Sequence, residues 1–252
     1  MIHNTTIDTQ MNHRSIRAFK DQSLTTEQLA TLYDVARCTS SSRFLQQFSI
    51  LHLTDAKKRA AVRTIAGQPY VGANGDLLIF IADLYRNQQL RHDMGQDDGS
   101  LHSFDEYMQA VEDTVLAVQN TVIAAESMGL GAVILGSIMN DPAQLVKTLE
   151  LPPMTFPILG VQVGIPDQEP QLKPRLPIAN MAFENDYPRG IKAADLKEYD
   201  DVVTTYYDLR DANRRIDSFT KQVAGAKLAH TDHHRDQLVQ LLHDQGLALD
   251  MK

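Results

Sequence analysis

Residues 103–131 read SFDEYMQAVEDTVLAVQNTVIAAESMGLG and contain the strongest helical pattern in this chain. Ser103 and Glu106 have the spacing of a capping box, and Gly129 and Gly131 are the residue type that commonly ends a helix. Apolar side chains between these signals recur at steps of three and four: Met108, Val111, Val115, Val118, Val122 and Ala125. We therefore expect one long helix that forms the central buried element of the fold.

Shorter elements flank this helix in the sequence. Strands are expected at residues 48–53, 77–82, 132–135 and 156–165, and the uninterrupted apolar run 77–82 is typical of a fully buried strand. Thr25, Asp55 and Asp141 are the expected N-caps of further helices. Because helices and strands do not alternate regularly, the sequence favours an α+β fold over a parallel sheet.

The prolines at 170, 174 and 177 indicate an extended segment after the last strand. From about residue 196 the pattern is helical again. We expect a single domain over residues 1–252, with about 168–252 forming an extended arm and a C-terminal excursion.

Composition excludes several classes of protein. The formal net charge of −8 argues against binding to nucleic acid or to anionic membranes, and the apolar run 77–82 is too short to span a bilayer. The N-terminus lacks the basic and apolar regions of a signal peptide. Cys38 is the only cysteine, so no intrachain disulfide and no cysteine-based metal site is expected, and a small buried side chain is the favoured interpretation. These features predict a cytoplasmic protein.

Two short basic segments stand out against this acidic background: His13-Arg14-Ser15-Ile16-Arg17 and Lys173-Pro174-Arg175-Leu176-Pro177. Guanidinium groups, a hydroxyl and backbone N–H groups are the donors that a phosphate needs. If the fold brings the segments together, they predict a pocket for a phosphorylated cofactor. The alternative is that these side chains are ordinary surface ion-pair partners. The glycine-rich phosphate loops and the serine-hydrolase elbow are absent from the sequence.

A histidine cluster offers a second possible site. His230, His233 and His234 have spacings that place imidazoles on one helix face, as a metal site requires. No other cluster completes a set of ligands, so we favour a solvated face and expect no metal.

Six motifs that occur in a fixed order narrow the interpretation of the two basic segments. They are HRSIRAF at 13–19, SSS at 40–42 leading to FLQ at 44–46, GQ at 67–68, QN at 119–120 with AAESMGLG at 124–131, KPRLP at 173–177, and NRR at 213–215. This order resembles the FMN-dependent nitroreductase superfamily. The branch that it resembles contains the oxygen-insensitive NADPH nitroreductases and NADPH–flavin oxidoreductases. The resemblance extends from about residue 11 to the C-terminus.

The resemblance implies a homodimer with a mixed, mainly antiparallel sheet flanked by helices. It also implies a long buried central helix, C-terminal segments exchanged between protomers, and FMN at the dimer interface. The residues that the resemblance assigns to FMN binding are His13, Arg14, Ser15, Arg17, Ser41, Phe44, Gln46, Gln68, Leu135, Gly136, Ser137, Lys173 and Arg175. Phe44 and Gln46 are expected to line the site from the other subunit.

The nicotinamide donor is expected to be NADPH, with NADH possible. The candidates for its 2′-phosphate are Arg214, Arg215 and Lys221, in a region that matches the family weakly. Ser137 stands where the family often has a second glycine after Gly136.

The implied activity is a ping-pong transfer of two electrons from NAD(P)H through FMN to a nitroaromatic, a quinone, an azo compound or free flavin. No side chain needs to act as a catalytic group, because the cofactor carries the chemistry. Two alternatives remain open: a flavin reductase that supplies reduced FMN to a partner, and a non-catalytic FMN-binding protein.

Overall fold

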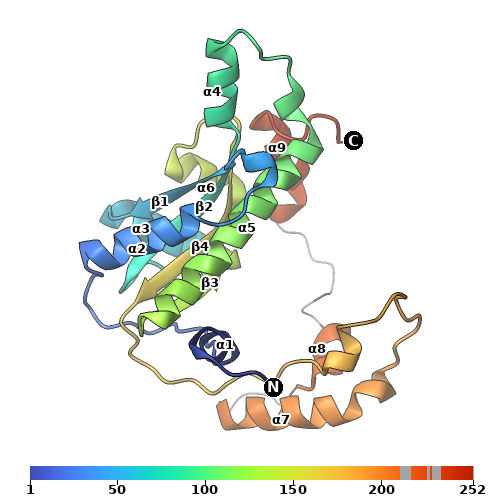
Figure 1. The fold of residues 1–252 in the computed structure, drawn as a ribbon. Helices are drawn as coiled ribbons and strands as arrows, with labels where there is room; N and C mark the ends of the chain where they lie inside the picture. The colour runs from blue at the N-terminus through green and yellow to red at the C-terminus, as the bar shows by residue number, and fades with distance from the viewer. Residues whose placement is uncertain (211–216, 226–227, 229–233, 252) are drawn as a thin grey trace. The chain divides into compact units, whose positions relative to one another are not determined.

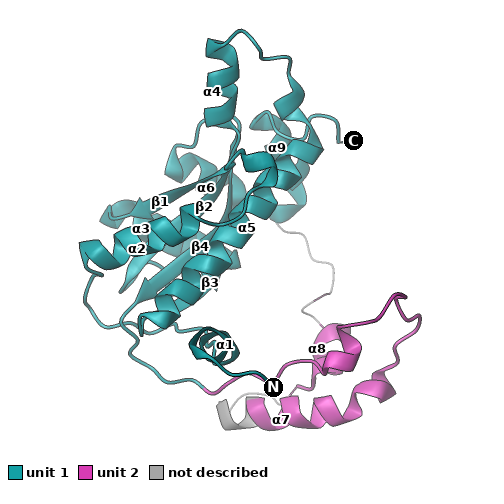
Figure 2. Ribbon diagram, viewed as in Figure 1, with its two compact units in different colours: residues 1–170, 233–252 teal, residues 171–232 magenta. Residues whose placement is uncertain are grey.

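The computed structural model describes residues 1–210, 217–225, 228 and 234–251, which fall into two compact units. Unit 1 comprises Met1–Pro170 and His233–Lys252, and unit 2 comprises Gln171–Asp232 (Figure 2). The C-terminal residues therefore return to the unit that contains the N-terminus. That the whole chain works as one domain stays a prediction.

A four-stranded sheet forms the middle of unit 1. Its strands are β1 (Phe48–Leu53), β2 (Asp76–Asp83), β3 (Gly131–Leu135) and β4 (Thr155–Gly164), in the order β1-β2-β4-β3. Every neighbouring pair is antiparallel, and the N-terminal segment adds one isolated parallel bridge between Ser15 and Ala132. The expected α+β fold is confirmed, with strands close to their predicted bounds.

Helices surround this sheet (Figure 1). They are α1 (Thr5–Met11), α2 (Thr26–Arg37), α3 (Ala56–Ala66), α4 (Tyr85–Asp93), α5 (Phe104–Ser127), α6 (Pro142–Leu149) and α9 (Leu238–Asp244). Four short 3₁₀ helices join them: η1 (Ser42–Phe44), η2 (Ser100–His102), η3 (Gly136–Asn140) and η6 (His234–Gln237). Thr25, Asp55 and Asp141 cap α2, α3 and α6 through their side chains, as the sequence predicts.

Both faces of the sheet are covered, which explains why β2 is buried along its whole length. Leu77, Ile79 and Ile81 of β2 belong to a core cluster on the side of α3 and α6. Leu78 and Phe80 point the other way, into a cluster with α2 and α5. This alternation is what a strand buried between two helical layers requires.

The long helix α5 begins after Ser103, whose hydroxyl accepts from the backbone of Glu106. The second half of the expected capping box is absent, because the carboxylate of Glu106 pairs with Arg43 instead. The predicted apolar side is also partly wrong. Val118, Val122 and Ala125 are buried, but Val115 is 42% exposed. The helix is therefore buried along one side only, and its outer side carries apolar residues.

The C-terminal residues complete a third core cluster in unit 1. Leu242, Leu247 and Ala248 pack with Tyr107 and Phe156, whose rings meet edge to face at 6.3 Å. The main-chain N–H of Leu249 also donates to the carbonyl of His102. The end of the chain is thus part of the sheet-containing unit.

Unit 2 contains η4 (Ile178–Asn180), η5 (Ala193–Leu196), α7 (Lys197–Arg210) and α8 (Phe219–Ala224). Asp200 of α7 accepts from the backbone and the hydroxyl of Thr220 at the start of α8, and Tyr199 packs edge to face on Phe219. Residues 171–177 run without regular structure, as the prolines predict.

Two further expectations can be compared with the structure. Cys38, expected to be buried, is exposed and forms the C-cap of α2, because that helix ends one residue earlier. Among the described residues, no helix is long and apolar enough to cross a membrane.

Candidate functional site

The segment His13–Arg17 lies beside β3. The backbone N–H of Ile16 donates to the carbonyl of Ala132 at 2.9 Å. This approach needs a glycine at the start of the strand, since a Cβ on Gly131 would lie 2.7 Å from the Ile16 side chain. The sequence signals at 13–17 and 129–131 therefore belong to one contact.

His13 is oriented by the end of α5. Its Nδ1 lies 2.6 Å from Oε1 of Glu126, whose side chain is only 12% exposed. The other carboxylate oxygen, Oε2, is buried and has no hydrogen-bond partner in the described part of the chain. The AAESMGLG motif thus supplies the residue that holds the histidine of the HRSIR motif.

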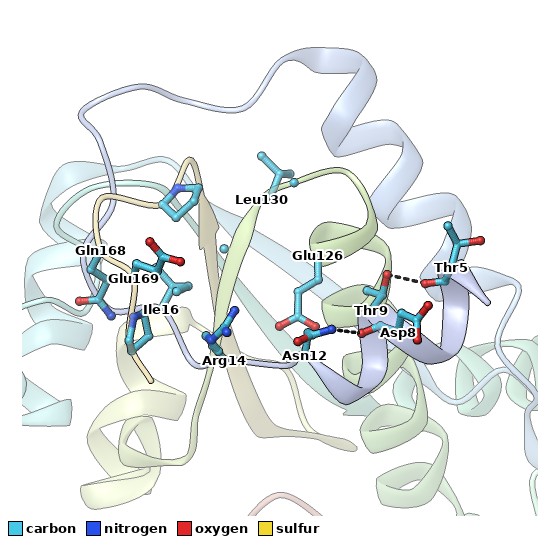
Figure 3. Close-up of a pocket in the computed structure, with 14 residues that line it drawn as sticks. Thr5, Asp8, Thr9, Asn12, Arg14, Ile16, Glu126, Leu130, Gln168 and Glu169 are labelled. Atoms are coloured by element: carbon cyan, nitrogen blue, oxygen red, sulfur yellow. Dashed lines mark hydrogen bonds between the residues drawn. The ribbon is translucent and has the colours of Figure 1, made fainter. Parts of the chain in front are cut away.

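Arg14 extends into a cavity of about 530 Å³ (Figure 3). Its Nε is buried and makes no hydrogen bond to a described residue. The walls of the cavity include the carboxylates of Asp8, Glu126 and Glu169. A guanidinium with an unused buried donor suits an oxyanion, but Arg14 alone does not balance these carboxylates, so a bound phosphate needs further cations.

Arg17 contacts Tyr70, in the turn after α3 that also carries Gln68. The Arg17 guanidinium carbon lies 5.9 Å from the centre of the Tyr70 ring, within the range of a cation–π interaction. Gly67 ends α3 in the left-handed conformation, with φ of +60°, and leaves Gln68 exposed. The sequence prediction of a turn at Gly67–Gln68 is confirmed.

The end of β3 leaves open space beside it. Leu135 is buried, Gly136 is exposed, and a Cβ built on Gly136 would meet no atom within 4 Å. Ser137 is half-buried in η3. A backbone without a side chain next to open space allows a flat ring system to approach the strand end, which fits the predicted flavin contact.

Arg235 is a residue that the sequence analysis did not single out. Its Nη2 donates to the carbonyl of Gly136 at 2.7 Å and to Oδ1 of Asn140, and its Nε donates to the carbonyl of Met139 at 2.9 Å. The C-terminal segment therefore stabilises the position of η3 through hydrogen bonds of Arg235. No local signal marks this contact, because its two sides are almost 100 residues apart in the chain.

The segment Ser41–Gln46 is held by the other half of α5. Asp113 accepts from the backbone N–H groups of Ser42 at 2.7 Å and Gln47 at 3.1 Å. Phe44 and Gln46 have positive φ, and Phe44 is 82% exposed. The loop is firmly attached and presents an aromatic ring to the outside.

Two groups of the predicted flavin-binding residues of unit 1 are therefore anchored at separate points of α5. One group, with His13, is anchored at Glu126, and the other, with Phe44, is anchored at Asp113. These anchors are 13 positions apart on one helix, which corresponds to roughly 20 Å along its axis. The fold does not bring the two groups together within one chain.

Comparison with known proteins gives this arrangement a family. Residues 11–165 match the model of the nitroreductase family, and residues 173–250 match the model of the nitroreductase family C-terminal domain. This chain belongs to the nitroreductase family. The resemblance inferred from the motifs is confirmed.

This nitroreductase is similar over most of its length to curated proteins and solved structures. It is 38% identical to the FMN reductase (NADPH) of Bacillus subtilis (strain 168), over 87% of this chain and 90% of that protein. It is 36% identical to the NADPH-flavin oxidoreductase of Vibrio harveyi, over 97% and 99%. The structure of B. megaterium NfrA1 superimposes with a TM-score of 0.91 at 34% identity, covering 97% of this chain and 100% of that one.

Other predicted residues of the nitroreductase lie outside unit 1. Lys173, Arg175 and Lys221 belong to unit 2, while Arg214 and Arg215 lie outside the described residues. Their roles stay predictions.

Of the three histidines weighed as metal ligands, His234 alone is described, at the start of η6, and His230 and His233 are not. The described residues contain no group of three or more histidine, cysteine or acidic side chains arranged for a metal.

Proposed function

We propose that this nitroreductase is an FMN-dependent oxidoreductase that takes electrons from NADPH and passes them to small acceptors such as nitroaromatics, quinones or free flavin. The observation that carries the proposal is the placement of Arg14, whose buried Nε has no partner among the described residues, at a cavity that Leu130 and Gly131 line at the start of β3. The similarity to an FMN reductase (NADPH) and an NADPH-flavin oxidoreductase supports the same conclusion.

The residues of unit 1 fit the chemical parts of FMN. Arg14 and the Ser15 hydroxyl are donors for the phosphate, and His13, held by Glu126, stands next to them in the chain. We propose Lys173 and Arg175 as the further phosphate ligands, on the sequence resemblance. Bound FMN would supply a two-electron carrier that accepts a hydride from the nicotinamide and delivers it to the acceptor.

Arg17 and Gln68 would act at the ring system. The positive charge of Arg17 favours the anionic reduced form of a flavin placed beside it, and so raises the electron affinity of that flavin. Gly136 admits the ring because it has no side chain in the open space beside the strand end. The protein's part in the reaction is to bind, orient and tune the cofactor, and no side chain is proposed as a nucleophile.

We further propose that the enzyme is a homodimer in which each flavin site combines the His13 group of one protomer with Ser41, Phe44 and Gln46 of its partner. The separation of the two groups along α5 supports this arrangement. Val115 and Leu116 lie on α5 between the two anchors and are 42% and 50% exposed. Exposed apolar side chains at such a place are suited to burial against a second copy.

We infer a cytoplasmic location from the unpaired Cys38 and the proposed use of NADPH. As nucleotide donor we propose NADPH, with NADH as the weaker alternative, and Arg214, Arg215 and Lys221 as candidates for recognising the 2′-phosphate.

The deciding experiment is an anaerobic absorbance spectrum of the purified protein after reconstitution with FMN. NADPH is expected to bleach the absorbance band of oxidised flavin in the blue region of the spectrum, and to do so faster than NADH. A protein that binds no FMN would overturn the proposal. Bound FMN that neither nucleotide reduces would move the function to non-catalytic flavin binding.

The names of the relatives favour one acceptor in particular, free flavin. We propose that reduced FMN released in this way serves a partner enzyme. Steady-state rates with free FMN and with a nitroaromatic, at the same NADPH concentration, separate this role from nitro-group reduction. A higher kcat/KM for free FMN would support flavin reduction.

A further inference from the structure

Residues 67–75, called here the 67–75 turn, join α3 to β2 and carry Gln68 and Tyr70. The backbone carbonyls of all residues from Tyr70 to Gly75 accept a hydrogen bond from a side chain of Gln162, Arg63 or Arg59. Most surface loops leave such groups to water. The carbonyls of this turn are instead bound by three side chains of the same protein.

Gln162 makes the innermost contacts. It lies on β4 between Val161 and Val163 and is 0% exposed. Its Nε2 donates to the carbonyls of Tyr70 at 2.9 Å and Asn74 at 2.7 Å, and its Oε1 accepts from the N–H of Gly72 at 2.8 Å. Both donors and one acceptor position of the amide are therefore used by one turn.

Two arginines of α3 hold the outer part of the turn. Arg63 donates to the carbonyls of Val71 at 2.8 Å and Gly72 at 2.7 Å. Arg59 donates to the carbonyls of Gly72, Ala73 and Gly75. Burial, partly offset by Asp76, lowers the pKa of the Arg59 guanidinium, as expected for a cation paired mainly with neutral carbonyl dipoles.

The 67–75 turn positions the side chains that are proposed to lie beside the flavin ring. Tyr70, whose carbonyl Gln162 holds, places its ring against the guanidinium of Arg17. Gln68 precedes it by two residues, and its carbonyl accepts from the N–H of Val71. A shift of the turn would therefore move Tyr70 and Gln68 and change the contact of Tyr70 with Arg17.

An amide at this place is not required to bury the strand. The two neighbours of Gln162 on β4 are buried valines, and an apolar residue at 162 would give the strand the same burial. The net stability from a buried side-chain hydrogen bond is small, whereas its geometry is specific. Loss of the amide would leave the carbonyls of Tyr70 and Asn74 and the N–H of Gly72 without this partner, so it would change the shape of the turn as well as the stability of the fold.

We propose that Gln162 is a positioning residue that sets the flavin environment through the 67–75 turn, without itself contacting the cofactor. This inference rests on the proposed binding of FMN at Arg17 and Gln68. Arg63, which donates to carbonyls in the outer part of the turn, is proposed to position the turn in the same way.

The test compares Gln162→Met with Gln245→Met in otherwise unchanged full-length protein. Both variants replace an amide that donates to two backbone carbonyls, but Gln245 contacts those of Pro152 and Thr155, away from the turn. Three quantities are measured: the Kd for FMN by titration of the apoprotein, the visible spectrum and midpoint potential of the bound flavin, and the Tm of the apoprotein.

Gln162→Met is expected to raise the Kd for FMN about tenfold, the loss that corresponds to one misaligned hydrogen-bonding contact. It is also expected to shift the flavin spectrum and to make the potential more negative, because Arg17 is less well placed. Gln245→Met is expected to lower the Tm and to leave the spectrum and the potential unchanged.

Arg63→Met provides a second variant that leaves the sheet interior intact, in case Gln162→Met does not fold. It is expected to change the spectrum and the potential in the same direction by a smaller amount. Wild-type affinity, spectrum and potential in a folded Gln162→Met, or in Arg63→Met if the first variant is unfolded, would overturn this inference alone. Wild-type protein that binds no FMN would overturn the proposed function and this inference with it.

Discussion

The polar side chains of the candidate site in this nitroreductase differ in whether the chain itself provides them with an interaction partner. Glu126 holds His13, and Tyr70 covers Arg17, but the buried Nε of Arg14 has no partner among the described residues. Gln47, Arg91 and Glu126 also have buried polar atoms without a partner in this part of the chain, but Arg14 is the one cation among them that lines the cavity. It is therefore suited to an anionic ligand, because binding costs its Nε no internal hydrogen bond.

Arg14→Gln is accordingly expected to weaken FMN binding. A hydrogen bond to a charged group contributes about 1.5–3 kcal/mol, so the Kd is expected to rise roughly 10- to 150-fold. Titration of the apoprotein with FMN measures the change. Lys57→Gln, which removes a positive charge from an exposed position on α3, is the matched control. An equal loss of affinity in both variants would mean that overall charge, and not a contact with Arg14, binds the phosphate.

Tyr107 makes the stability of unit 1 depend on pH. Burial raises the pKa of its hydroxyl from 10.0 to about 12. Below pH 10 the group is neutral in both states, so its contribution to stability is complete. Between pH 10 and 12 only the unfolded chain loses the proton, and the free energy of unfolding falls by about 3 kcal/mol.

Urea unfolding at pH 9 and at pH 11 measures this effect. Tyr107→Phe is expected to show a smaller loss of stability between these values than the wild type. Tyr187→Phe, at a tyrosine exposed to solvent in unit 2, is the control and is expected to keep the wild-type loss. The same pH dependence in Tyr107→Phe as in the wild type would contradict the assignment.

At the scale of elements, α5 organises the site from both of its halves. Its C-terminal half holds His13 through Glu126, and its N-terminal half holds the loop with Phe44 through Asp113. The helix therefore works as a rigid spacer between two groups of predicted flavin-binding residues. A spacer of this kind makes the distance between the groups independent of the flexibility of either loop.

Asp113→Asn is expected to loosen the loop of Ser41–Gln46 while leaving α5 intact. One carboxylate oxygen becomes an NH₂ group that faces a backbone N–H, and the resulting unsatisfied donor costs about 1–3 kcal/mol. Hydrogen exchange at the amides of Ser42 and Gln47 reports the loosening directly. Asp34→Asn, which alters an exposed pair with Arg37, is expected to leave these amides protected. Unchanged exchange in Asp113→Asn would refute the role of Asp113.

On the scale of the whole molecule, one protomer contains both groups of predicted flavin-binding residues, and their anchors on α5 are roughly 20 Å apart. A symmetric dimer solves this problem, since a two-fold axis brings the first group of one copy to the second group of the other. The exposed Val115 and Leu116 on α5 are the apolar residues between the two groups.

Leu116→Glu is expected to weaken dimerisation at least about tenfold, because the two-fold axis brings the introduced charges near each other in an apolar interface. Light scattering over a concentration series measures the dissociation. Retention of FMN is expected to fall in parallel, since each site in the proposed dimer combines residues of both protomers. Leu249→Glu, at an equally exposed leucine near the C-terminus, is the control. A stable dimer of Leu116→Glu would place the interface elsewhere.

The sequence by itself determined most of the elements and the family, and it predicted candidate residues for the site. Caps at Thr25, Asp55 and Asp141, the buried strand β2 and the close of α3 at Gly67 all follow from local patterns, because propensity, capping and alternation act over a few residues. The six ordered motifs likewise identified the family without coordinates.

Only the tertiary structure decided how these residues combine. Val115 belongs to the apolar repeat of α5 but is exposed to solvent. The repeat alone does not show how much of the helix surface packs against the rest of the fold. Cys38 is exposed because a helix end, and not composition, sets its surroundings. The contacts of Gln162 with the 67–75 turn and of Arg235 with η3 join residues about 90 to 100 positions apart. No local signal encodes such contacts, since they exist only after the chain has folded.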